Sequence, residues 1–247
     1  MIRTPQNSAP DATSSASLAT NLAGLRQRID AAATRAGRDV HSVTLLAVSK
    51  GQSAARIREA LELGLTAFGE NYLDEALPKI EALAGTPATW HFIGRLQANK
   101  TRPVATHFHW VHGIDRARIA ERLSAQRPHF APPLDVCLQV RVAEDPGKAG
   151  VEPAQCLALA REVAALPRLR LRGLMCMLPF EAAPGEQHAG FARLRALADT
   201  LRAAGLPLDT LSMGMSADMD AAIAEGATIV RIGTALFGPR PHVESPA

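Results

Sequence analysis

Short apolar runs rich in β-forming residues alternate with helical segments along nearly the whole chain of 247 residues. A helix expected at 17–36 precedes the first run, and each run is followed by another candidate helix. Because strands that alternate with helices form parallel sheets, the pattern predicts an α/β fold. The eight runs lie at 43–49, 67–70, 90–94, 110–114, 134–142, 171–177, 210–215 and 228–233.

Eight strand–helix units in a chain of this length predict a single (β/α)8 TIM barrel, which we place at residues 17–240. An open, doubly wound sheet would also satisfy the alternation, but its GxGxxG and GxxxxGK[ST] motifs are absent. In a barrel, the functional site is expected at the carboxyl ends of the strands. We expect a disordered N-terminal tail at 1–16 and a C-terminal tail at 241–247.

Composition and charge argue against several classes of protein. The 27 basic and 24 acidic residues are interspersed, which is not the pattern of a nucleic-acid-binding surface. The chain contains neither an apolar run long enough to span a bilayer nor a secretory signal. Cys137, Cys156 and Cys176 lie in apolar or helical contexts, which favours reduced thiols. We therefore expect a cytoplasmic protein without nucleic-acid or membrane partners.

The first predicted strand leads into a lysine. Lys50 follows Leu-Leu-Ala-Val-Ser, and partial desolvation there would lower its pKa and expose a nucleophilic amine suited to Schiff-base formation. A strand-end lysine can equally extend its charge into solvent along an apolar stem. The residue alone therefore leaves both interpretations open.

The last two predicted strands end in turns that carry glycine, serine and threonine. Gly233 and Thr234 follow the eighth strand at a helix start, and Ser216 follows the seventh. Free backbone N–H groups at such turns bind phosphate, and the loops after strands 7 and 8 are the usual place for it in a barrel. Either turn alone would pass for an ordinary strand-to-helix connection. Together they predict a phosphate site opposite Lys50.

Two further strand ends carry candidate ligand contacts. Asn71 could bond a ring substituent while capping the helix expected from about residue 73. Met175 alternates with Met177 on the sixth strand, so one of them could pack against a planar ligand or belong to the core.

The histidines do not predict a metal centre. His107 and His109 would share a strand face at metal-ligand spacing, with His112 nearby, yet no carboxylate pair or cysteine completes a site. Trp90 and His91, on the third strand, are expected in the packed interior or against a helix.

Five segments of the sequence together resemble one known family. They are AVSKGQ (47–52), FGENYLDEA (68–76), WHFIGRLQANK (90–100), LRGLMCM (171–177) and LSMGMSADMDAAIAEGATIVRIGTALFG (211–238). In this order they are similar to the pyridoxal phosphate homeostasis proteins, also called the YggS or PROSC family. The likeness runs from about residue 18 to 240. It implies a barrel similar to the N-terminal domain of alanine racemase.

The resemblance also implies a cofactor, pyridoxal 5'-phosphate (PLP), and a set of site residues. The sequence departs from the family where Gly-Gln-Ser follows Lys50, since members often carry Thr, a second Lys and Pro there, and in the loop EDPGKAG (144–150). Roles of a second lysine beside Lys50 therefore do not transfer. By the resemblance Lys50 would hold PLP as a Schiff base, Ser216, Gly233 and Thr234 would hold the phosphate, Arg231 would face the pyridine nitrogen, and Asn71 and Met175 would flank the ring.

An arginine at the pyridine nitrogen disfavours protonation of the ring and makes it a poorer electron sink. Related racemases use a second base, a tyrosine from an additional β domain, whereas we expect no such domain here and the only tyrosine is Tyr72. We therefore expect a monomer that stores or delivers PLP, with PLP-dependent apoenzymes as candidate recipients and no committed reaction.

Two alternatives from the enzyme class remain. One is a PLP-dependent amino-acid racemase or related fold-type III enzyme, with Lys50 as one base and Tyr72 or water as the other. The other is a cofactor-free aldolase that forms a Schiff base through Lys50 and binds a sugar phosphate in the phosphate site.

Overall fold

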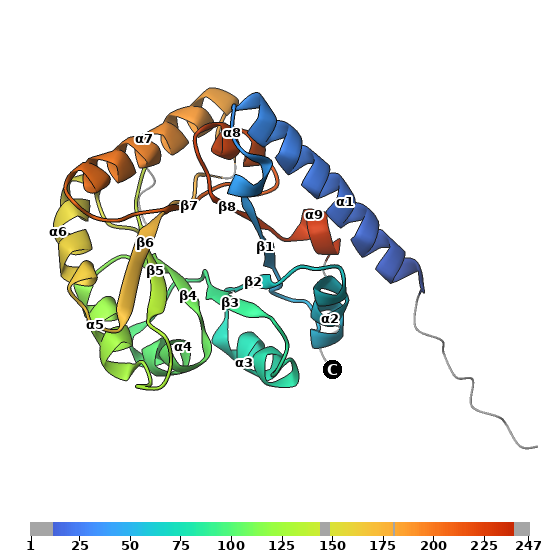
Figure 1. Ribbon diagram of the computed structural model, residues 1–247, viewed down its shortest axis with the longest axis horizontal. Helices are drawn as coiled ribbons and strands as arrows, with labels where there is room; N and C mark the ends of the chain where they lie inside the picture. The colour runs from blue at the N-terminus through green and yellow to red at the C-terminus, as the bar shows by residue number, and fades with distance from the viewer. Residues whose placement is uncertain (1–11, 144–148, 180, 240–247) are drawn as a thin grey trace, which may run out of the picture.

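The computed structural model describes residues 12–143, 149–179 and 181–239. Eight parallel strands form a closed barrel in chain order, and β1 pairs with β8 to complete the ring. This confirms the predicted (β/α)8 fold (Figure 1). The strands are β1 (Thr44–Val48), β2 (Ala67–Glu70), β3 (Thr89–Phe92), β4 (Trp110–Ile114), β5 (Leu134–Gln139), β6 (Leu169–Met175), β7 (Thr210–Ser212) and β8 (Ile229–Ile232).

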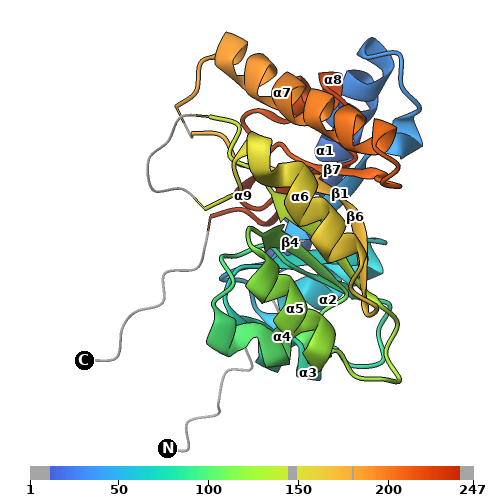
Figure 2. The same ribbon diagram turned by 90° about the vertical axis from the view of Figure 1, so that its left-hand side faces the viewer.

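Helices surround the barrel, and Figure 2 shows α5, α6 and α7 side by side over one flank. None of the helices in the described part of the chain combines the length and hydropathy needed to cross a membrane. The α-helices are α1 (Ala12–Arg35), α2 (Ala54–Glu62), α3 (Leu73–Ala82), α4 (Thr101–His107), α5 (Ala117–Gln126), α6 (Pro153–Ala164), α7 (Pro184–Ala203), α8 (Met219–Ala224) and α9 (Thr234–Phe237), with short 3-10 turns η1 (Val40–Ser42) and η2 (Ala98–Lys100).

Several boundaries differ from the sequence-based prediction. Helix α1 begins at Ala12 instead of residue 17, and the rest of the expected N-terminal tail, like the C-terminal tail, lies outside the described residues. Most of the loop at 144–150 also lies outside them. Strand β7 ends at Ser212, three residues early, because the chain bends at Gly214, whose φ of 92° favours glycine. Strand β5 likewise ends at Gln139 instead of residue 142.

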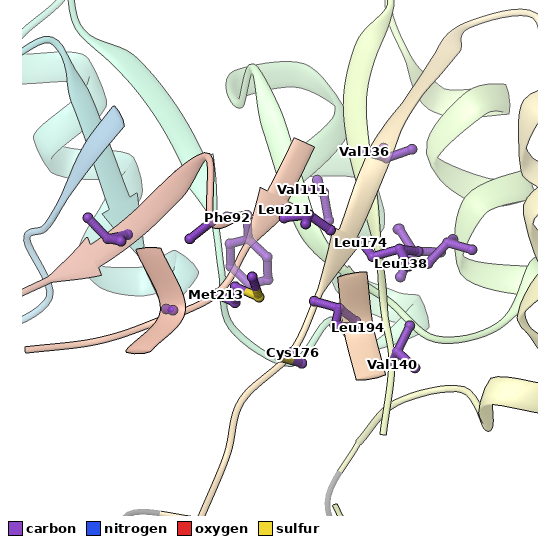
Figure 3. Packing of buried hydrophobic residues seen from close by; sticks show 14 of the residues in the cluster. Phe92, Val111, Val136, Leu138, Val140, Leu174, Cys176, Leu194, Leu211 and Met213 are labelled. Carbon is purple, nitrogen blue, oxygen red and sulfur yellow. The ribbon is translucent and has the colours of Figure 1, made fainter. Parts of the chain in front are cut away.

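Aliphatic side chains fill the space between the barrel and its helices. Figure 3 shows Leu138 of β5, Leu174 of β6 and Leu194 of α7 within this layer, and each is fully buried. Burying one such side chain contributes about 1.5–3 kcal/mol relative to leaving it exposed. The same layer holds Cys156 and Cys176, and all three cysteines are free and buried as expected.

A second, smaller apolar cluster lies apart from this layer and joins Leu46 of β1, Ile93 after β3 and Ile229 of β8, with Val48 packed against it. Side chains alternate between the two faces of a strand, so Leu46 and Val48 share one face of β1. Because members of this cluster come from strands on both sides of β1, we place this face inside the barrel. Lys50 lies two residues beyond Val48, in the turn at the carboxyl end of β1.

Charged side chains gather near the amino ends of β5, β6 and β7. Arg172 lies 3.2 Å from an oxygen of Asp135 and 2.7 Å from one of Asp209, and its guanidinium is 4.9 Å from the ring centroid of Trp110. The charges of Arg172, Asp135 and Asp209 are thus paired with one another. The carboxyl ends of the strands are thus left as the place for ligand chemistry.

Candidate cofactor site

Lys50 and the end of β8 lie together. Residues Ala47 and Ile232 are register partners on the paired strands β1 and β8, so the two strands leave the barrel side by side. One hollow at this point is lined by Val48, Lys50, Gln52, Gly233, Thr234 and Gly238. The structure therefore brings the predicted Schiff-base lysine to two of the three predicted phosphate residues.

The turn after β8 fits closely against β1. A Cβ added to Gly233 would lie 3.5 Å from the Val48 carbonyl oxygen, an ordinary van der Waals contact, so the turn packs directly against the end of β1. The Gly233 carbonyl accepts hydrogen bonds from the N–H groups of Leu236 and Phe237, which fixes the turn. Gly233 and Thr234 thus line the same hollow as Lys50.

Helix α1 braces both predicted phosphate loops (Figure 1). Arg28 donates to the Ser216 carbonyl at 3.1 Å and pairs with Asp220 of α8 at 2.6 Å. Asn21 donates to the Leu236 carbonyl in α9 at 3.0 Å. These contacts join residues about 190 to 215 positions apart in the sequence, and no local sequence pattern predicts them.

Arg231 is buried and held by oxygen atoms of two neighbouring strand ends. Its Nη1 donates to the carbonyl oxygen of Ser212 at 2.7 Å and to its Oγ at 2.9 Å, and Nη2 donates to the Cys176 carbonyl at 2.8 Å. Burial lowers the pKa of Arg231. Among the described residues no carboxylate is paired with this guanidinium, and Met175, next to Cys176, is buried at the end of β6.

Asn71 lies at the end of β2 but does not cap the next helix. Helix α3 has Tyr72 as its N-cap and no side-chain cap bond, so the expected capping role is wrong. Asn71 Oδ1 is buried without a hydrogen-bond partner among the described residues. The backbone segments after β2 and β3 approach so closely here that only glycine fits at position 94, because a Cβ on Gly94 would come within 2.2 Å of the Asn71 carbonyl oxygen.

An unpartnered buried acceptor is costly, and a ligand that carries a hydroxyl would satisfy it. This fits PLP, whose ring bears a hydroxyl group. Asn71 lines a different hollow from Lys50, with Tyr72, Phe92, Gly94 and Arg95 among its neighbours. A ligand that reached both residues would extend across the ends of β1 and β2.

Sequence reasoning missed a buried ion pair behind Lys50. Lys79 of α3 lies 2.8 Å from Glu70 Oε1 and donates to the Ser49 carbonyl, also at 2.8 Å. The Ser49 hydroxyl donates to the same carboxylate oxygen at 2.6 Å, and Glu75 accepts from the Gly51 N–H at 2.8 Å. Burial raises the pKa of Glu70, which the bonds from Lys79 and Ser49 oppose. Both neighbours of Lys50 are thus fixed from the helix side.

The histidines divide into two groups. His91 is buried as expected, together with Trp90, and its Nδ1 lies 3.0 Å from Nε2 of the fully buried His112. His107 and His109 do not share a strand, because His107 ends α4 and His109 precedes β4. Among the described residues, no group of three His, Cys, Asp or Glu side chains is placed to hold a metal ion.

Comparison with known proteins identifies the family. Residues 20–241 match the model of the alanine racemase N-terminal domain. The chain is 57% identical over 225 residues to the pyridoxal phosphate homeostasis protein of Pseudomonas aeruginosa, covering 91% of this chain and 96% of that protein. It is 50% identical over 229 residues to the protein of the same name in Escherichia coli, covering 91% and 97%.

Solved structures agree with this. PipY of Synechococcus elongatus, crystallised with PLP bound, superposes with a TM-score of 0.80 at 40% identity, covering 90% of this chain and all of PipY. Alanine racemase of Corynebacterium glutamicum superposes with a TM-score of 0.70 at 17% identity over 94% of this chain and 64% of the racemase, which shows the shared fold alone. The chain therefore belongs to the alanine racemase N-terminal domain family and, within it, to the pyridoxal phosphate homeostasis proteins.

Proposed function

We propose that this protein binds PLP at the mouth of its barrel, holds it as a Schiff base on Lys50, and stores or delivers it within the cell. The observation that carries the proposal is the hollow shared by Lys50, Gly233 and Thr234. An amine and a phosphate-binding turn in one hollow are what an aldehyde that carries a phosphate requires. PLP bound to PipY supports the choice of ligand.

The remaining residues take the roles that their positions allow. Ser216, Gly233 and Thr234 hold the phosphate, Arg231 faces the pyridine nitrogen, and Asn71 accepts from the ring hydroxyl while Met175 lies against the ring. PLP itself supplies an aldehyde and an electron-withdrawing ring. The hydrogen bonds that Arg231 donates to the carbonyl oxygens of Ser212 and Cys176 hold its guanidinium in place without the cofactor.

Two features favour a carrier over a catalyst. A guanidinium without a carboxylate partner is a full positive charge, which disfavours a proton on a ring nitrogen beside it. Tyr72 lines the hollow of Asn71 and not that of Lys50, and 59% of its surface is exposed. It is therefore poorly placed as the second base of a racemase. We further propose a monomer in the cytoplasm, where the free, buried cysteines would stay reduced.

Solvent exchange and cofactor transfer test the carrier role against the racemase. The PLP-loaded protein, at high concentration in D2O with an L-amino acid, should leave the α-proton signal unchanged while restoring activity to a PLP-dependent apoenzyme. Lys50→Ala, treated identically, is the control for free PLP. Steady loss of the α-proton signal would establish the racemase instead. The cofactor-free aldolase would be excluded if the protein as isolated contained stoichiometric PLP.

Arg28→Leu is expected to weaken PLP binding about fivefold, because the lost bond to the Ser216 carbonyl is worth roughly 1 kcal/mol. Its effect on unfolding should stay below about 1 kcal/mol, since the Arg28–Asp220 pair is 41% exposed on both sides. Arg35→Leu is the matched control, because Arg35 also bonds Asp220 but not Ser216. Equal PLP affinities of the two variants, measured by absorbance titration, would contradict the bracing role of α1.

A further inference from the structure

A chain of buried polar side chains crosses the barrel from β3 to β8. His91 Nδ1 lies 3.0 Å from His112 Nε2, and His112 Nδ1 lies 2.8 Å from Ser212 Oγ. Ser212 Oγ in turn lies 2.9 Å from Nη1 of Arg231. All four side chains belong to residues that are at most 5% exposed. This series of hydrogen-bonded side chains therefore ends on Arg231, the residue that we propose faces the pyridine nitrogen.

The direction of every hydrogen bond in this chain can be assigned. Arginine has donors only, so Arg231 donates to Ser212 Oγ. Among the described residues the only other partner of this hydroxyl is His112 Nδ1. A buried hydroxyl whose proton found no acceptor would be costly, so we infer that Ser212 donates to His112 Nδ1. His112 must then carry its proton on Nε2, from which it donates to His91 Nδ1. Both histidines are thereby neutral, with the proton on Nε2.

The electrostatic surroundings of the two histidines agree with neutral imidazole rings. Arg231 is the charged group in contact with this hydrogen-bonded series, and burial lowers the pKa of His91 to about 3 and that of His112 well below its usual value. The His91 ring is further fixed by stacking on Trp110, with centroids 5.3 Å apart and planes at 8°. The hydrogen-bonded series therefore consists of three neutral side chains, His91, His112 and Ser212, and ends on the positively charged Arg231.

We propose that His112 and His91 are positioning residues that orient Arg231 through Ser212 for its contact with the cofactor. The proposal rests on the proposed function, because it assumes that Arg231 faces bound PLP. An acidic partner could also have oriented the guanidinium, but it would have offset its charge. The groups that bond Arg231 are neutral, so no carboxylate paired with it among the described residues offsets its charge, and Asp218 acts on it only at longer range.

The protein without PLP tests the assignment directly. Long-range proton–nitrogen NMR spectra of the ¹⁵N-histidine-labelled protein at pH 7 should show both rings as the neutral form protonated on Nε2. His112→Asn and His91→Gln assign the signals. A positively charged imidazole ring at His91 or His112, or a proton on Nδ1 of His112, would contradict these hydrogen-bond directions.

PLP titrations then test coupling to Arg231. His112→Phe should weaken PLP binding about tenfold in the natural chain but less than about twofold when Arg231 is already Met, because coupled residues are not additive. The visible absorption band of bound PLP should shift in His112→Phe. In His112→Asn, which keeps an acceptor near the Nδ1 position, both affinity and band should return most of the way.

Strand β7 offers a matched control. Ser212→Ala should reproduce the loss seen for His112→Phe, whereas Thr210→Val should not, because the Thr210 hydroxyl bonds Asp209. If His112→Phe weakened PLP binding by the same factor whether residue 231 is Arg or Met, the positioning role would be overturned although PLP binding itself would stand. Failure of the natural chain to bind PLP would instead overturn the proposed function, and with it the role of Arg231 toward PLP.

Discussion

Replacement of Lys79 by Met is expected to lower the free energy of unfolding by about 3–5 kcal/mol, the range found when one partner of a buried ion pair is removed. Glu70 is fully buried, and its Oε1 would lose the ammonium that lies 2.8 Å away. Its Oε2 is already without a partner among the described residues. Urea denaturation at pH 7.5 measures the change.

Two further variants separate charge from packing. Glu70→Leu combined with Lys79→Met should recover much of the lost stability, because replacing both partners by apolar groups is often nearly neutral. Lys100→Met is the matched control, since Lys100 lies 3.6 Å from an Asp74 carboxylate that is 92% exposed and should change stability by less than about 1 kcal/mol. A Lys79→Met effect as small as that of Lys100→Met would show that the buried pair does not stabilise the fold.

Stability is expected to fall as the pH is lowered from 7 to 5, by up to about 1.4 kcal/mol per pH unit for each of His91 and His112. Burial lowers the pKa of both, that of His91 to about 3. Below pH 6.5 the unfolded chain therefore takes up protons that the folded chain does not. The contribution is fully present above pH 6.5 and is lost as the pH falls toward the pKa values of the folded state.

Glu70 acts in the opposite sense, because its raised pKa lets the folded chain take up a proton first. Comparison with His112→Asn isolates the histidine contribution from this effect. Denaturant unfolding at pH 7, 6 and 5 should give a shallower dependence in the variant, by up to about 1.4 kcal/mol per unit. Identical pH dependences would mean that His112 titrates alike in the folded and unfolded chain.

The alternation of strands and helices predicted an α/β fold, and the number of strand–helix units, the absence of the glycine motifs of an open sheet and the family resemblance favoured the barrel, whose strand ends were expected to carry the site. The sequence predicted a phosphate site opposite Lys50, and the structure places Gly233 and Thr234 beside it because β1 and β8 are neighbours in the closed barrel. Boundaries failed where one residue changes the backbone, as at Gly214 after β7. The roles toward PLP of all the predicted site residues stay predictions, those of Lys50, Gly233 and Thr234 as well as those of Asn71, Met175, Ser216 and Arg231.

What the sequence did not predict depends on contacts between distant segments. Lys79 has the spacing of a solvated helix residue, and only the packing of α3 on β2 places it against Glu70. His112 and Ser212 are 100 positions apart. Their pairing follows from the closure of the barrel and leaves no local pattern.

Reduction with borohydride and peptide mapping tests the central claim most directly. The protein mixed with equimolar PLP should show a visible absorption band, and after reduction it should carry one pyridoxyl group on Lys50. Lys50→Ala should lose both signals, and the peptides that contain Lys79, Lys100 and Lys148 should be unmodified. A pyridoxyl group on another lysine, or no band at any PLP concentration, would contradict the assignment of Lys50 as the residue that holds PLP.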